Sequence, residues 1–136
     1  MVNLEKYKQT EKMEGVIKAL SEMTLRAFLE TEEKIKAFCK GMTKFPKNVT
    51  TEAEKEQYRQ DRLDGNVLVV SYAVTMSDKV YTNSEFLNLP TPIGWGRSKL
   101  KAFKEKNDLP SDTNKWLHEK IRVTINKDGY LRLMED

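Results

Sequence analysis

A run of alternating side chains at residues 67–76, Val-Leu-Val-Val-Ser-Tyr-Ala-Val-Thr-Met, constrains the fold more than any other part of this chain. Successive side chains of a β-strand point to opposite faces, and every even-numbered position of this run carries a large apolar residue. The odd-numbered positions are small or apolar too, which is typical of a strand in the middle of a sheet. The sequence therefore predicts a sheet with a buried central strand.

Three more strands and one helix are expected after this run. Ser77-Asp78 predicts a tight turn into a strand at 80–87. A third strand at 118–125 and a last one at 130–134 are joined by a turn in which Gly129 can adopt a positive φ. Between these two hairpins, residues 98–107 have the apolar spacing of a short helix.

The first part of the chain has a helical period instead. Apolar residues recur every three or four positions from residue 4 to about 42, and no proline interrupts them before Pro46. The apolar stripe shifts near Phe28, which favours either two helices with a break near Thr31 or one long helix. A shorter helix is expected at 52–63, capped by Thr50 or Thr51.

These elements predict a single α+β domain of 136 residues. Its N-terminal helices, within residues 1–63, are expected to pack on a small antiparallel sheet formed by residues 64–136. The sheet is expected to be OB-like, or another arrangement of two hairpins with an intervening helix at 98–107.

Positive charge is concentrated in one segment. Residues 88–106 hold five basic side chains and one acidic side chain, and the whole chain has a net charge of only +3. Trp95 lies there between two glycines, so a base could stack on it while the cations hold phosphates. Two simpler explanations stay open: the cations form a solvated helix face, and Trp95 packs into the core.

The candidate binding residues come from the predicted helix and the final hairpin. In the helix, Leu100 and Phe103 are expected to face the core, with basic residues on both flanks. On the hairpin, basic and aromatic side chains share the outward face, as they do where sheets bind single strands, although ordinary hairpins show this pattern too. The predicted nucleic-acid-binding residues are Trp95, Arg97, Lys99, Lys101, Lys104, Lys120, Arg122, Tyr130 and Arg132.

Three short motifs carry a resemblance to a known family: residues 98–103 (Ser-Lys-Leu-Lys-Ala-Phe), 120–125 (Lys-Ile-Arg-Val-Thr-Ile) and 128–130 (Asp-Gly-Tyr). With them, residues 67–134 resemble the small OB-type single-strand-binding proteins of phages and archaea. The resemblance implies a DNA-binding or RNA-binding protein of viral or archaeal type. It covers half of the chain, and only four strands are evident where an OB barrel has five. The fifth would have to come from residues 44–49.

Enzymatic and metal chemistry find little support in the sequence. His118 and Cys39 are the only histidine and the only cysteine, so they cannot supply a structural zinc site. No nucleophile, base or phosphate-binding motif can be assembled, and we expect a non-enzymatic protein without a cofactor. The chain also lacks a signal peptide and a membrane span, which predicts a cytoplasmic protein with no membrane partner.

Two functions are therefore expected. The first is binding of single-stranded DNA or RNA. The alternative is a protein–protein interaction or self-assembly module, because the apolar residues of the N-terminal helix extend further than one small sheet can cover. In that case a homodimer through the N-terminal helix is expected.

Overall fold

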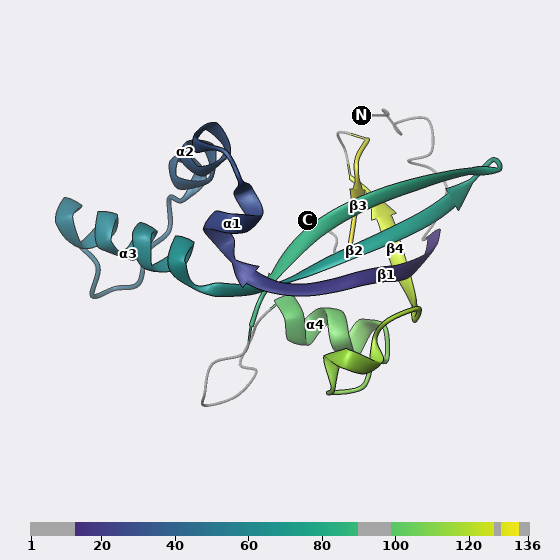
Figure 1. The fold of residues 1–136 in the computed structure, drawn as a ribbon. Helices are drawn as coiled ribbons and strands as arrows, with labels where there is room; N and C mark the ends of the chain where they lie inside the picture. The colour runs from purple at the N-terminus through teal and green to yellow at the C-terminus, as the bar shows by residue number, and fades with distance from the viewer. Residues whose placement is uncertain (1–12, 90–98, 127–128, 134–136) are drawn as a thin grey trace. The chain divides into compact units, whose positions relative to one another are not determined.

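The computed structural model describes residues 13–89, 99–126 and 129–133 of the chain. Contacts divide the chain into two compact units. We call residues 22–67 the helical unit and the remainder, residues 1–21 and 68–136, the barrel unit. The elements in chain order (Figure 1) are β1 (Met13–Thr24), α1 (Leu25–Leu29), α2 (Glu32–Gly41), α3 (Glu52–Asp64), β2 (Asn66–Met76), β3 (Lys79–Asn88), α4 (Lys99–Lys106), a 3₁₀ turn (Thr113–Lys115), β4 (Lys120–Ile125) and β5 (Leu131–Arg132).

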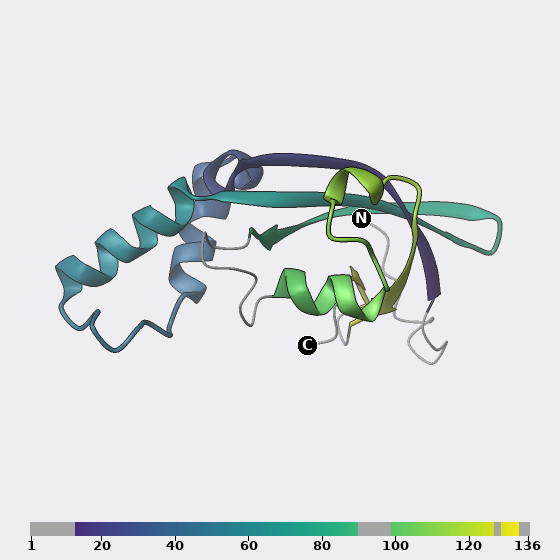
Figure 2. The same cartoon turned by 90° about the horizontal axis from the view of Figure 1, so that it is seen from below.

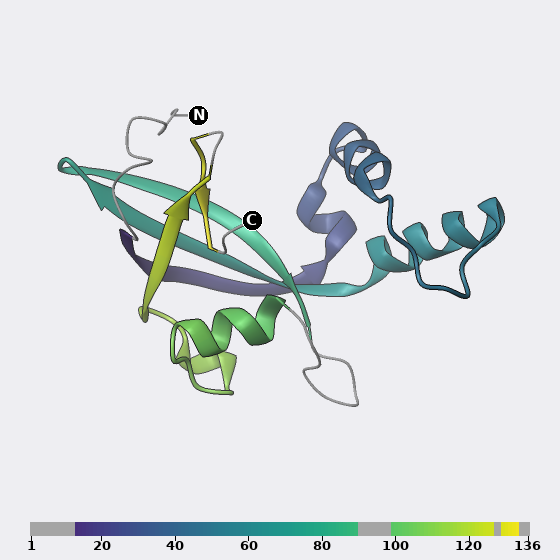
Figure 3. The same cartoon turned by 180° about the vertical axis from the view of Figure 1, so that it is seen from behind.

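The barrel unit is built on a five-stranded antiparallel sheet with the strand order β3-β2-β1-β4-β5. β4 pairs on one side with β1, where Gly15 lies opposite Ile121, and on the other side with β5. In Figures 1 and 3, β4 and β5 run at a steep angle to the long β2–β3 hairpin, as expected for a sheet that curls. The result is a nearly closed, barrel-like sheet.

The core of the barrel unit confirms the period of two in β2. The even-numbered side chains of 68–76 all belong to one buried cluster, together with residues of β1, β3, β4 and β5. α4 contacts β3 (Figure 2). It contributes Leu100 and Phe103 to the same cluster, as expected from the helical spacing. Trp116 is fully buried beside Phe103, with 5.8 Å between the ring centroids.

Both predicted hairpin turns are present. Ser77 and Asp78 have φ values of 50° and 67°, as in the two-residue turns that match the twist of paired strands. Gly129 has a φ of 86°, which an L-residue with a side chain seldom adopts. Local sequence alone was sufficient to predict both turns.

The prediction of N-terminal helices packed on a sheet is wrong. Residues 13–24 form β1, which is the central strand of the sheet, and helices begin only at Leu25. The proposed fifth strand at 44–49 is also wrong, because β1 supplies it and residues 42–51 connect α2 to α3. The apolar spacing in 13–24 fits a helix by chance, and pairing with β4 decides the outcome over intrinsic propensity.

Gly15 explains why this segment suits a central strand. A Cβ atom at this position would lie 2.7 Å from Cγ2 of Val123, 3.2 Å from Cγ2 of Val74 and 3.3 Å from the carbonyl oxygen of Ala73. The neighbouring strands therefore approach β1 more closely than any other residue would allow. In a helix, the same glycine would have been destabilising.

In the helical unit, α1 packs against α2 and α3. Of the two alternatives for this segment, the break near Thr31 is the one found: α1 ends at Leu29, and the Thr31 hydroxyl accepts the Lys34 N–H at 3.2 Å and caps α2. Thr51 caps α3 in a capping box with Glu54. The Arg26 guanidinium joins α1 to α3 by contacts of 3.1 Å to Asp64 and 2.7 Å to Gln60.

The β1 part of the apolar stripe that suggested a homodimer is accounted for. Ile17 is fully buried in the barrel unit, and Met13 and Leu20 pack against the same core. These residues therefore cover their own sheet and do not form an unused helix face. The homodimer, like the single domain, stays a prediction.

Candidate functional site

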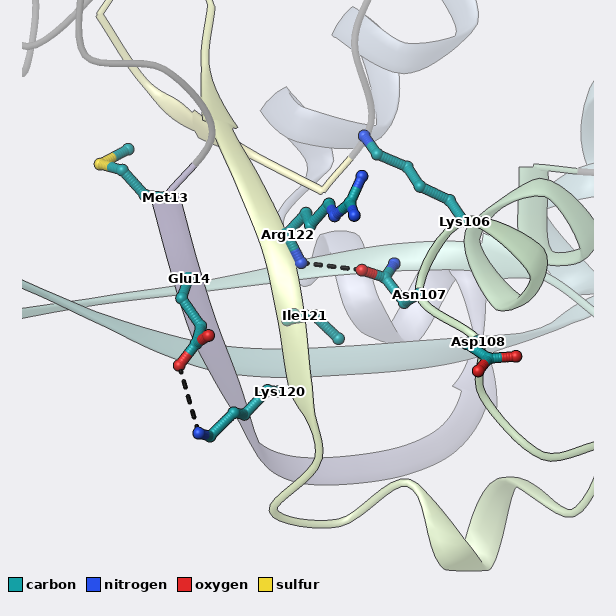
Figure 4. A pocket seen from close by; sticks show the side chains of 8 residues that line it. All are labelled: Met13, Glu14, Lys106, Asn107, Asp108, Lys120, Ile121 and Arg122. Atoms are coloured by element: carbon teal, nitrogen blue, oxygen red, sulfur yellow. Dashed lines mark hydrogen bonds and ion pairs between the residues drawn. The ribbon is translucent and has the colours of Figure 1, made fainter.

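A cationic groove lies on the barrel unit where the end of α4 approaches β1 and β4. Its volume is about 560 Å³, and it is open to solvent (Figure 4). Among the described residues, those that line it are Met13, Glu14, Lys106, Asn107, Asp108, Lys120, Ile121 and Arg122. We call this site the α4–β4 groove.

Asn107 holds the two walls of the groove together. Its Oδ1 accepts the backbone N–H of Arg122 at 2.8 Å, and its Nδ2 donates to the Phe103 carbonyl at 3.0 Å. One side chain thereby fixes the last turn of α4 against β4. The following residue, Asp108, has a φ of 53° and turns the chain away from the helix. The side chains of Lys106 and Arg122 point toward one another from these two walls, whereas that of Lys120 points toward Glu14 (Figure 4).

The charge of the groove is mixed, with a cationic excess. Lys106, Lys120 and Arg122 provide three positive charges, whereas Glu14 and Asp108 provide two negative charges. Lys120 Nζ lies 3.7 Å from Glu14 Oε1, and both side chains are mostly exposed. Such a pair contributes little to stability, and a stronger anion can displace Glu14 from it. The groove therefore suits a ligand with several spaced anionic groups.

The structure brings together only part of the predicted binding set. Lys120 and Arg122 line the α4–β4 groove, whereas Lys101 and Lys104 lie on the flank of α4 opposite Lys106, beyond the buried Leu100 and Phe103. Lys99, on the Lys106 flank, acts electrostatically on Glu85 of β3.

Two residues of the set cannot be placed, and two lie on the final hairpin. Trp95 and Arg97 lie outside the described residues. Tyr130 and Arg132 share the non-core face of the final hairpin with Arg122, because Arg132 is the register partner of Thr124. Tyr130 is 39% exposed, so its ring is accessible.

Sequence reasoning omitted Lys106 and Asn107 from the site. Lys106 was recognised only as a basic residue on a helix flank, and Asn107 only as the end of the helix. Their groove neighbours on β4 lie more than ten residues further along the chain, and those on β1 lie more than ninety residues earlier. The one local signal was the asparagine itself, a residue that often satisfies nearby backbone groups.

A second polar cluster connects the two strands at the ends of the sheet order, β3 and β5. The Tyr72 hydroxyl donates to Glu85 Oε2 at 2.5 Å, and the Leu133 N–H donates to the same oxygen at 2.9 Å. Asn83 Nδ2 donates to the Leu131 carbonyl at 3.1 Å and to the Tyr72 oxygen at 3.2 Å. We call this cluster the β3–β5 seam.

Burial raises the pKa of both ionisable groups of the seam, Glu85 and Tyr72. It raises the pKa of Glu85 above its ordinary value, although hydrogen bonds from Tyr72 and Leu133 and the charges of Arg132 and Lys99 act in the opposite direction. Burial, together with the neighbouring Glu85, also raises the pKa of Tyr72. Perturbed acids can mark active sites, but Glu85 Oε2 and Asn83 Nδ2 each have a structural partner on the other side of the seam.

The raised pKa of Glu85 predicts a pH-dependent stability. The folded protein binds a proton at this site more tightly than the unfolded chain, so stability should fall as pH rises from about 4.5, the ordinary value, through the raised pKa. Glu85→Gln should remove this decline while keeping an acceptor in the seam. Urea unfolding of both proteins from about pH 4 to about pH 8 measures the difference.

Ser84→Ala is the matched control for this experiment. Ser84 is exposed on the other face of β3, where its hydroxyl lies 2.7 Å from that of Ser71. The variant should keep the wild-type pH dependence. Parallel curves for wild type and Glu85→Gln would show that the carboxyl group does not carry the effect.

The described residues contain no group of three or more acidic, histidine or cysteine side chains that could hold a metal ion. Within the same ranges, no helix combines the length and apolarity required to cross a membrane. Comparison of the chain with protein-family models, curated proteins and solved structures gives no match.

Proposed function

We propose that the barrel unit binds single-stranded nucleic acid across the α4–β4 groove and the outward face of β4 and β5. The presence of Lys106, Lys120 and Arg122 along one open groove carries this proposal. Phosphates attract such cations, and the release of counterions from the strand adds to the affinity. A groove that holds three spaced cations accommodates successive phosphates better than a single small anion.

The arrangement of the sheet supports the same proposal. A nearly closed barrel of order β3-β2-β1-β4-β5, with α4 between β3 and β4, is compatible with an OB-like fold. OB folds often bind single strands through a basic groove and exposed aromatic rings. Tyr130 supplies such a ring. It pairs with Asn126, four residues after Arg122, which places it about 13 Å from Arg122 along the strand. One strand could then contact the groove and stack a base on Tyr130.

The test is the salt dependence of binding to an oligonucleotide. A labelled oligo-deoxythymidine of about 16 nucleotides is titrated at about 50 mM and about 200 mM salt, and fluorescence anisotropy gives Kd. Three phosphate contacts on a single strand contribute about 2 to the slope of log Kd against log salt. The triple variant Lys106→Gln/Lys120→Gln/Arg122→Gln should lose this contribution to the slope. Between the two salt concentrations, its Kd should therefore rise about 20-fold less than the Kd of the wild type.

A control with the same change in charge is available in the helical unit. Lys34, Lys36 and Lys40 are exposed on α2, and their triple glutamine variant should bind the oligonucleotide with nearly the wild-type salt slope. Equal slopes for the wild type and the groove variant would refute the site. A wild-type protein that does not bind at the lower salt concentration would refute the function.

A further inference from the structure

The helical unit contains a second concave site that the nucleic-acid proposal does not use. A cleft of about 390 Å³ lies between the end of α2, the following connection and α3. We call it the α2–α3 cleft. The described residues that line it are Ala37, Phe38, Gly41, Met42, Lys44, Tyr58 and Arg62.

The walls of the cleft are held by contacts outside it. The ring of Phe45, in the connection, packs edge-on against Tyr58 with 5.7 Å between centroids. The Lys55 and Arg59 cations lie 5.6 Å and 5.2 Å from the centre of the same ring. The capping box at Thr51 fixes the start of α3. The cleft is thus formed before any ligand arrives, which lowers the cost of binding.

The chemistry of the cleft is apolar with a cationic edge. Ala37, Phe38 and Met42 give it an apolar lining, and methionine adapts readily to different apolar partners. α2 has no buried residue, so its apolar side chains are only partly covered in the described structure. The charged side chains that line the cleft, Lys44 and Arg62, are both basic.

We propose that the α2–α3 cleft binds a short amphipathic helix of a partner protein, with apolar anchors in the cleft and acidic residues facing Lys44 and Arg62. Helix-in-groove recognition uses apolar anchors spaced three or four residues apart, which matches a cleft of this size and lining. The charge complementarity selects acidic residues beside those anchors. This inference goes beyond the proposed nucleic-acid function and does not depend on it.

Two other occupants fit less well. α3 carries five acids, Glu52, Glu54, Glu56, Asp61 and Asp64, which would repel a nucleic-acid strand with a charge at every nucleotide. A partner helix, in contrast, can carry acidic residues only at the positions that face Lys44 and Arg62. A second copy of the chain would have to offer an apolar face with acidic flanks, whereas the apolar face of α2 is flanked by the basic Lys34 and Lys36.

Gly41 provides a variant that blocks the cleft without straining the fold. It is the last residue of α2, and a Cβ added there would meet no atom within 4 Å. Gly41→Gln therefore places a side chain at the cleft and replaces a poor helix former. The charge variant Lys44→Glu/Arg62→Glu tests the cationic edge independently.

The experiment uses two labelled peptides of about 14 residues, a length at which isolated helices begin to form. Both carry leucines at helical spacing; acidic residues flank the leucines in one peptide, and lysines flank them in the other. The acidic peptide should bind the wild-type protein with a Kd of about 10 µM, as measured by anisotropy, and the lysine peptide should bind at least about tenfold more weakly. Gly41→Gln should raise the Kd for the acidic peptide about tenfold.

The charge variant gives the sharpest outcome. Lys44→Glu/Arg62→Glu should reverse the preference, so that the lysine peptide binds more tightly than the acidic one. Equal binding of both peptides, no effect of Gly41→Gln, competition by an oligonucleotide, or displacement of the peptide by self-association would each overturn the proposal. The Lys106/Lys120/Arg122 glutamine variant should bind the acidic peptide as the wild type does, which separates the two proposals.

Discussion

Replacing Trp116 with alanine should lower the free energy of unfolding by about 3–5 kcal/mol. Trp116 is completely buried and is among the largest side chains of the barrel core. Its ring packs on Phe103 of α4, and its Nε1 donates to the Pro110 carbonyl at 2.6 Å. The substitution removes the apolar contacts, leaves a cavity and deprives Pro110 of its donor.

Urea unfolding followed by far-ultraviolet circular dichroism measures this loss without relying on tryptophan emission. Trp116→Phe is the matched control, because it keeps a ring against Phe103 but loses the N–H donor. It should cost about 1–2 kcal/mol, between the wild type and the alanine variant. A loss below about 1 kcal/mol for Trp116→Ala would contradict the packing described for this residue.

Gly15→Val should be the most disruptive single change in β1, with a cost of about 3 kcal/mol. Cβ alone would already lie 2.7 Å from Cγ2 of Val123, and the carbonyl oxygen of Ala73 limits movement on another side. The strand must therefore shift away from its neighbours in the middle of the sheet. Thermal and urea unfolding should both report the loss.

The contact with Val123 can be isolated by a double-mutant cycle. Gly15→Ala and Val123→Ala should each destabilise the protein, and the double variant should be more stable than the sum of the two losses by about 1 kcal/mol. Lys18→Val, at an exposed position of the same strand, should be close to neutral. If Gly15→Val were as harmless as Lys18→Val, the close approach of the strands around Gly15 would be refuted.

Elements that depend on neighbouring residues could be predicted from the sequence. The apolar alternation in β2, the turns at Ser77-Asp78 and Gly129, the Thr51 cap and the burial of Leu100 and Phe103 all rest on local periodicity or backbone preference. These signals act over a few residues, so no knowledge of the rest of the fold was needed.

The remaining features depend on partners that are distant in the sequence. Residues 13–24 have apolar spacing compatible with a helix, and only pairing with β4 makes them a strand. Glu85 and Asn83 resemble ordinary polar residues of a half-exposed strand until β5 is brought against them. The α4–β4 groove likewise depends on the chain after Asn107, which turns back and brings Arg122 of β4 into the same groove as Lys106.

The β3–β5 seam has a consequence for how the protein behaves at high concentration. The outer strands of an open sheet can accept a strand from another molecule and so start aggregation. Here Asn83 binds the Leu131 carbonyl of β5 and Glu85 binds the Leu133 N–H just after it, so an incoming chain would have to displace them and leave a buried acid without its donors. The same side chains that complete the barrel thus act as a barrier to intermolecular sheet extension.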